Sequence, residues 1–114
     1  MEEKIRKIDF NEDELWIDYI AKENLTNNFT RRGIWIDTED LLKELAPILS
    51  QDIHSITVEP YLILVDQYGK EELSKVALIT INRATWEEIN WENFLTDNIP
   101  NIADNYWLHP ALSD

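Results

Sequence analysis

The chain has 114 residues, 44% of them hydrophobic, which predicts one folded domain with a single core. Its 23 acidic residues against 10 basic ones give a formal net charge of −13, which excludes a typical nucleic-acid or anionic-membrane binder. The lack of cysteine excludes a disulfide scaffold and fits a reducing compartment. We find no signal peptide and no apolar run near the roughly 20 residues of a membrane span, so we expect a cytoplasmic protein.

The first third of the chain is predicted to hold one helix between two irregular segments. Residues 1–11 are a charged lead-in that forms either a first helical turn or a frayed tail. Residues 12–24 carry apolar side chains at helical spacing behind an acidic first turn. The polar stretch 25–33 is typical of a loop, with Gly33 supplying backbone freedom. Residues 33–37 form either a short strand or an extended approach to the next helix.

The stretch WIDTEDLLKELAPILS, residues 35–50, predicts a short helix rich in carboxylates. Asp37 or Thr38 can cap its N-terminus, which places acidic residues at the positive end of the helix dipole. Leucines and isoleucines recur at the spacing of a buried face, and Pro47 ends the regular helix. The carboxylates expected mainly on the solvent side are Asp37, Glu39, Asp40 and Glu44.

The middle of the chain predicts a β-sheet. Residues 54–59 and 73–83 are rich in β-branched side chains, and residues 61–65 form an apolar run typical of a central strand covered on both faces. Pro60 separates the first two segments, which are either two strands or one bent strand. Gly69, flanked by polar residues, predicts a hairpin turn.

The last part predicts one more helix and a short strand. Thr85 and Glu88 form a capping box at the start of the helix, and Pro100 ends it. Residues 106–108 form either a short strand or an extended segment packed on the sheet. The predicted fold class is therefore α+β, an antiparallel sheet of four to five strands packed against two to three helices in one domain, residues 1–114.

Groups suited to catalysis or metal binding are few. His54 and His109 are the only imidazoles, and they lie far apart without a cysteine partner. With Gly33 and Gly69 as the only glycines, the chain has neither a phosphate-binding loop nor a dinucleotide fingerprint. Carboxylates are numerous, but nothing singles out two of them as an acid pair for glycoside chemistry. We therefore expect no enzyme activity, no metal and no cofactor.

The acidic residues are unevenly spread along the chain. Between Gly33 and Gly69 the only base is Lys43, and after Arg83 there is none. One side of the folded domain should be strongly negative and should dock in a basic cleft, where DNA or RNA normally lies. Trp35, beside the acidic helix, either packs in the core, which is the commoner place for tryptophan, or anchors a partner.

The order of these features resembles a known family. An N-terminal helix, a polar loop containing TNNF, a tryptophan, the acidic helix TEDLLKELAP, a β-rich centre and the closing NIPNIADNYWL follow one another over about residues 17–108. This order is similar to that of the staphylococcal-type uracil-DNA glycosylase inhibitors. The resemblance implies an acidic mimic of DNA that occupies the DNA-binding groove of uracil-DNA glycosylase and blocks uracil excision.

The resemblance also implies which side chains contact the enzyme. Carboxylates stand in for phosphates, and an apolar pocket between helix and sheet receives the apolar loop that the enzyme inserts into DNA. The acidic contacts expected are Asp37, Glu39, Asp40, Glu44 and Glu59. The apolar pocket is expected at Leu42, Ile56, Val58 and Leu62. We expect a monomer that forms a one-to-one complex.

Two other kinds of function fit the same sequence. An immunity protein against a nuclease toxin, or a phage inhibitor of a CRISPR nuclease, needs the same carboxylates and differs only in its target. A small metabolic or structural domain can instead be acidic for solubility alone. In that last case, charge reversal at Glu39 and Asp40 leaves partner capture unchanged.

Overall fold

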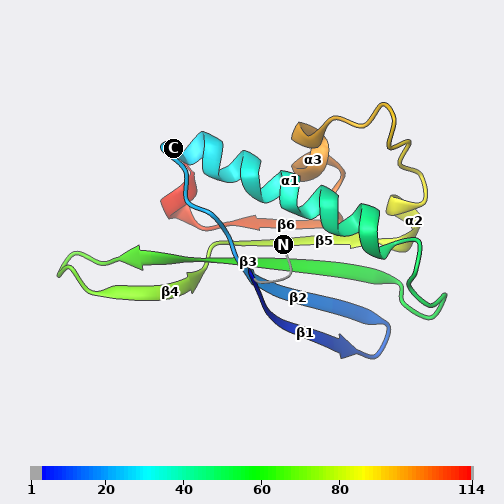
Figure 1. Ribbon diagram of the computed structural model, residues 1–114, viewed down its shortest axis with the longest axis horizontal. Helices are drawn as coiled ribbons and strands as arrows, with labels where there is room; N and C mark the ends of the chain where they lie inside the picture. Colours follow the sequence, from blue (N-terminus) through cyan, green and yellow to red (C-terminus); the bar gives the residue numbers. More distant parts are fainter. Residues whose placement is uncertain (1–3, 114) are drawn as a thin grey trace.

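A mixed β-sheet with one long helix across one face forms the frame of the protein (Figure 1). The computed structural model describes residues 4–113. Its strands are β1 (Ile5–Asn11), β2 (Glu14–Ile20), β3 (Ser55–Val65), β4 (Glu71–Lys75), β5 (Ala77–Asn82) and β6 (Asn105–Leu108). Its helices are α1 (Asn27–Leu45), α2 (Arg83–Trp86) and α3 (Ile99–Ile102), with 3-10 turns at Thr96–Asn98 and Pro110–Leu112. The predicted α+β class is confirmed.

The strand order is β1-β2-β3-β5-β6, and β4 pairs with the distal half of β3. All pairs are antiparallel except β2 with β3. A parallel pair needs a crossover, and α1 supplies it by running back over the sheet between the two strands. The remaining helical turns lie on the same side as α1 in Figure 1, so within residues 4–113 the helices cover one face of the sheet and leave the other face uncovered.

The N-terminal region differs from the prediction. The predicted helix 12–24 is wrong, because Leu15, Ile17 and Tyr19 alternate with less buried residues and form strand β2. Most of the predicted lead-in is strand β1 (Ile5–Asn11), which pairs with β2 as an antiparallel hairpin, while residues 1–3 lie outside the described part of the chain. An apolar residue every second position fits a strand with one buried face, and pairing with β3 fixes that choice.

Helix α1 begins much earlier than predicted. The expected loop 25–33 is wrong, because α1 starts at Asn27 and the Thr26 hydroxyl caps it by accepting a hydrogen bond from the Phe29 backbone N–H at 3.1 Å. The predicted caps Asp37 and Thr38 therefore lie in mid-helix, as do Glu39 and Asp40, which are away from the positive end of the dipole.

The other end of α1 agrees with the prediction. The helix ends at Leu45, shortly before Pro47. Trp35 is part of the helix rather than of a strand or an extended lead-in, and its indole Nε1–H donates to the Tyr106 hydroxyl of β6 at 3.2 Å. Trp35 thus ties the helix to the sheet and packs against the core.

Strand β3 is one continuous strand that passes through Pro60. On its β4–β5 side the register changes by one residue, from Tyr61 opposite Lys75 to Val58 opposite Ile79. This change is a β-bulge, and it places Val76 between β4 and β5 with its N–H donating to the Pro60 carbonyl at 2.9 Å.

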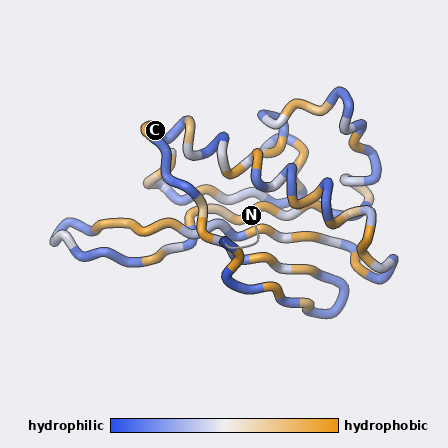
Figure 2. Tube along the Cα trace, in the orientation of Figure 1, coloured by the Kyte–Doolittle hydropathy of each residue, from blue (hydrophilic) through white to orange (hydrophobic). Residues whose placement is uncertain are grey.

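Beyond the bulge, β3 and β4 form an arm that extends past the body of the protein (Figure 1). The predicted turn at Gly69 is confirmed, with a φ of 80° that suits glycine. The prediction that residues 61–65 are covered on both faces is wrong, because Ile63 and Val65 are 55% and 62% exposed. Figure 2 shows hydrophobic residues continuing along this exposed arm.

The predicted helix from Thr85 to Pro100 is broken into short pieces. Helix α2 ends at Trp86, turns follow, and Pro100 lies in the first turn of α3 rather than at a helix end. The Thr85 hydroxyl donates to Asp104 at 3.1 Å instead of capping a helix. Residues 105–108 form strand β6, which confirms the strand among the two alternatives for the tail.

The core lies between α1 and the sheet. Its fully buried side chains include Tyr19, Ile34, Leu42, Ile56, Val58, Ile79 and Ile81. No helix within residues 4–113 is both long and apolar enough to cross a membrane.

Candidate partner-binding surface

Three carboxylates align along one flank of α1. Asp37, Asp40 and Glu44 are spaced three and four residues apart, which places them above one another on a helix. Asp40 and Glu44 are exposed, and Asp37 is half-buried. We call these three residues the α1 ridge.

The α1 ridge faces the β1–β2 side of the sheet. Burial raises the pKa of the Asp37 carboxyl, and this effect outweighs the opposing influence of the Tyr19 hydroxyl and of the positive charge of Lys4. The negative charge of Asp40 adds to the increase. Because Tyr19 belongs to β2 and Lys4 precedes β1, this flank of the helix lies toward the β1 edge of the sheet.

An apolar strip lies at that edge. Ile8 and Phe10 on β1 are directly opposite Ile17 and Leu15 on β2, so all four side chains point to the face that carries α1. Ile8 and Phe10 nevertheless remain 55% and 60% exposed. The sheet edge toward which the α1 ridge faces therefore carries an exposed apolar strip, which the sequence pattern did not predict.

Glu39 does not belong to the ridge. Its side chain is turned inward and buried, where it accepts a hydrogen bond from the Thr96 hydroxyl and forms an ion pair with Lys43 at 2.9 Å. Burial raises the pKa of Glu39, but the hydrogen bonds from Thr96 and Lys43 and the positive charge of Lys43 together lower it by more. The pKa of Glu39 therefore lies below its usual value. Glu39 thus connects α1 to the turn before α3.

The four residues expected to line an apolar pocket are core residues. Leu42, Ile56 and Val58 have no exposed surface, and Leu62 is 5% exposed. They pack against one another and their neighbours between α1 and the sheet. Exposed apolar side chains on the α1 side of the sheet are instead Ile8 and Phe10 of the strip on β1.

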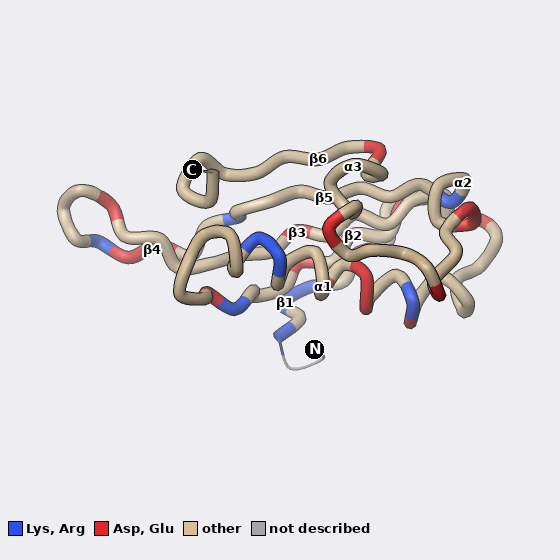
Figure 3. Tube along the Cα trace, turned by 90° about the horizontal axis from the view of Figure 1, so that it is seen from above, with Lys and Arg blue, Asp and Glu red and all other residues tan. Residues whose placement is uncertain are grey.

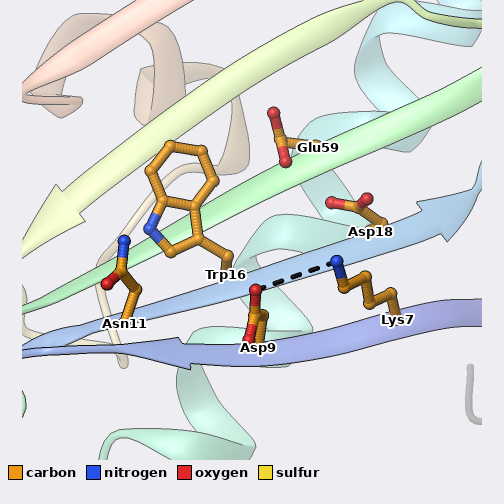
Figure 4. Close-up of a pocket in the computed structure, with 6 residues that line it drawn as sticks. All are labelled: Lys7, Asp9, Asn11, Trp16, Asp18 and Glu59. Atoms are coloured by element: carbon orange, nitrogen blue, oxygen red, sulfur yellow. Dashed lines mark ion pairs between the residues drawn. The ribbon is translucent and has the colours of Figure 1, made fainter.

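Glu59 lies on the uncovered face of the sheet, away from the ridge. It is buried there and accepts a hydrogen bond from Lys75 Nζ at 2.7 Å. Figure 4 shows it beside Asp18 at a small hollow of about 120 Å³. The hollow is lined by Lys7, Asp9, Asn11, Trp16, Asp18 and Glu59. Desolvation by burial is the main cause that raises the pKa of Asp18 to about 6, with a further increase from Glu59.

A second concentration of acids lies at the end of the protein where α1 finishes. The His54 N–H donates to the Asp13 carbonyl at 2.7 Å, and the Arg83 N–H donates to the His54 carbonyl at 2.7 Å, which brings the β1–β2 turn, the loop before β3 and α2 together. The acidic residues on these segments are Glu12, Asp13 and Glu14 at the β1–β2 turn, Asp52 before β3, and Glu87 and Glu88 after α2. Asp104 joins them by accepting hydrogen bonds from the Asn82 N–H and the Thr85 hydroxyl, and Glu44 lies in the last turn of α1. We call this group the acidic end (Figure 3).

Two basic residues, Lys43 and Arg83, lie near the acidic end, and each already has a carboxylate partner. Lys43 binds Glu39. The Arg83 guanidinium lies 3.5 Å from Glu87 and donates to the carbonyls of Ser50 and Ile53. The other carboxylates of this end keep a strongly negative surface in contact with water.

The described part of the chain has no group of three or more histidine and carboxylate side chains placed to hold a metal ion. No family model, no curated protein and no solved structure matches the chain.

Proposed function

We propose that the chain inhibits a nucleic-acid enzyme by placing the α1 ridge and the acidic end in the enzyme's basic groove. The alignment of Asp37, Asp40 and Glu44 along one helix flank carries this proposal. Successive helix turns rise about 5.4 Å, so the ridge presents negative charges at a regular spacing on a rigid element. A groove built for a phosphate backbone offers complementary charge.

We propose uracil-DNA glycosylase as the enzyme, on the strength of the sequence resemblance. An enzyme that extrudes a base from DNA needs a cationic surface for the phosphates and an apolar group that enters the base stack. The ridge meets the first need. Ile8 and Phe10 beside it offer contact area for the apolar group.

The direct test is uracil release from DNA by purified glycosylase as the protein is added. We expect release to stop at about one chain per enzyme. A ridge variant combines Asp37→Asn, Asp40→Asn and Glu44→Gln. Its control combines Asp66→Asn, Glu71→Gln and Glu72→Gln on the β3–β4 arm, and so removes the same charge elsewhere. We expect half-maximal inhibition by the ridge variant to need at least about tenfold more protein than inhibition by the wild type. The control should inhibit like the wild type.

Unchanged release at large excess rejects the glycosylase as the target. Capture from a cell lysate, followed by mass spectrometry, then separates the remaining possibilities. A nucleic-acid enzyme captured by the wild type and the control, but not by the ridge variant, keeps the proposed mode of action with a different target. Equal capture by all three proteins rejects the ridge as the binding surface.

A further inference from the structure

The outer edge of β4 has no neighbouring strand among the described residues. Strand β4 pairs with β3 on one side. On the other side β6 stops short of it, since its last ladder pair joins Leu108 to Ala77 and the His109 N–H then donates to the Val76 carbonyl at 2.8 Å. An edge of this kind is a template for a further strand.

The hydrogen-bond pattern shows which backbone groups face that free edge. The Asp66 N–H donates to the Lys70 carbonyl, and the Val76 N–H donates to the Pro60 carbonyl, both at 2.9 Å. Hydrogen-bonded pairs alternate along an antiparallel ladder. The backbone groups of Glu71, Leu73 and Lys75 therefore point away from β3.

These three residues form a self-complementary sequence. If a second β4 pairs antiparallel with Leu73 opposite Leu73, then Glu71 of each copy lies opposite Lys75 of the other. All outward-facing backbone groups find partners in this one register. The two opposite-charge pairs lie on the same face as the central leucines, because residues 71, 73 and 75 share one side of a strand.

The side chains on that face are also apolar at the centre. Leu73 is opposite Ile63 on β3, and with Ile20 these residues line a hollow of about 270 Å³ on the uncovered face. Ile63 is 55% and Ile20 42% exposed. A second copy related by a two-fold axis at Leu73 would bring an equal apolar group beside this one and so cover both.

We propose that two copies of the chain associate through β4, antiparallel about Leu73, and join their sheets into one. The arm and the acidic end lie at opposite ends of the long axis, which measures 47 Å (Figure 1). Association through the arm therefore keeps the two acidic ends apart and leaves both accessible. This inference replaces the monomer expected from the sequence, and it does not depend on the proposed function.

Sedimentation velocity over a range of protein concentrations tests the proposal with a matched pair of variants. Glu71→Lys places a lysine opposite Lys75 of the second copy, while Glu72→Lys makes the same charge change on the other face of the strand, opposite Ser74. The wild type should form a dimer. Glu71→Lys should raise its dissociation constant roughly tenfold or more, and Glu72→Lys should leave it close to the wild-type value.

Disulfide trapping gives an independent readout, because the chain has no cysteine of its own. The Leu73→Cys variant places two thiols on the two-fold axis, where Cα atoms of a hydrogen-bonded pair lie about 5.5 Å apart, within disulfide range. We expect a covalent dimer under mild oxidation, and much less from Tyr68→Cys at the exposed hairpin tip. A monomeric wild type, equal weakening by both lysine variants, or equal trapping of both cysteine variants overturns the proposal.

Discussion

Asp18 and Glu59 are register partners on the parallel strands β2 and β3, and both lie on the sheet face opposite α1. Burial raises the pKa of Asp18 first, and the hydrogen bond and negative charge of Glu59 raise it further, to about 6. Lys75 binds Glu59 at 2.7 Å, so the shared proton belongs on Asp18. In mildly acidic solution Asp18 is therefore neutral, while Glu59 keeps its ion pair with Lys75.

Replacing Asp18 with asparagine should stabilise the protein near neutral pH. The pKa of Asp18 rises from 3.8 to about 6 on folding, so the native state holds more protons and is stabilised below pH 4. This contribution is lost as the pH rises through 6. We expect Asp18→Asn to gain on the order of 1 kcal/mol at pH 7.5, less than the full shift because the carboxyl group is partly exposed.

Urea unfolding at pH 4, 5, 6 and 7.5 measures this effect. The control is Asp9→Asn, which removes a carboxylate from the same face at an exposed position. We expect the Asp18→Asn variant, but not the control, to lose part of the pH dependence between 4 and 7.5. Parallel curves for the wild type and Asp18→Asn would contradict the assignment.

Local signals predicted some elements well and others poorly. The Gly69 turn, the end of α1 near Pro47 and the final strand depend on short-range chemistry, and the structure has all three. The segment ELWIDYI fits both a helical and a two-residue period over its short length. Only its pairing with β3, more than thirty residues later, makes it a strand.

The start of α1 was predicted wrongly for another reason. Asn27, Asn28, Thr30 and Gly33 are weak helix formers, which makes residues 27–33 resemble a loop. In the structure the Thr26 cap and the packing of Ile34 against the core hold them in the helix. Of the predicted site residues, Asp37, Asp40 and Glu44 come together because helical spacing alone aligns them. Glu59 could not be placed without knowing which face of β3 the helix covers.

Glu39 should act as a structural residue rather than a contact for a partner. We expect Glu39→Gln to cost about 1 to 2 kcal/mol of unfolding free energy at pH 7, because the charged hydrogen bonds with Thr96 and Lys43 are lost or weakened. Its lowered pKa means that the contribution is present above the unfolded-state pKa and lost as the pH falls through the folded value.

Chemical denaturation at pH 7 and pH 3 checks this expectation, with the exposed Asp40→Asn as the matched control. Thr96→Val alone should cost less than Glu39→Gln, and the double variant should cost less than the sum of the two. Strict additivity would show that the two side chains do not interact.

Leu42 should affect stability and not partner recognition directly. We expect Leu42→Ala to cost about 2 to 4 kcal/mol, because the side chain is fully buried and its removal leaves a cavity. Ile48→Ala, at a position that is 76% exposed, should cost less than about 0.5 kcal/mol. Thermal and urea unfolding give both values. A loss of unfolding free energy below about 1 kcal/mol for Leu42→Ala would instead indicate that the surrounding core relaxes to fill the cavity.

Salt should slow binding to the target more than it speeds dissociation. Exposed carboxylates steer a basic partner at long range, and ions at ordinary concentrations screen that attraction over about 8 to 10 Å. We expect the association rate measured by stopped flow to fall steeply with salt for the wild type. The slope should be shallower for the variant with Asp37→Asn, Asp40→Asn and Glu44→Gln, because the α1 ridge has lost its charge.

The control with three neutralised carboxylates on the arm should keep a steeper slope than the ridge variant, because the carboxylates that it loses lie far from the acidic end. An association rate independent of salt in the wild type would show that binding does not rely on the acidic surface.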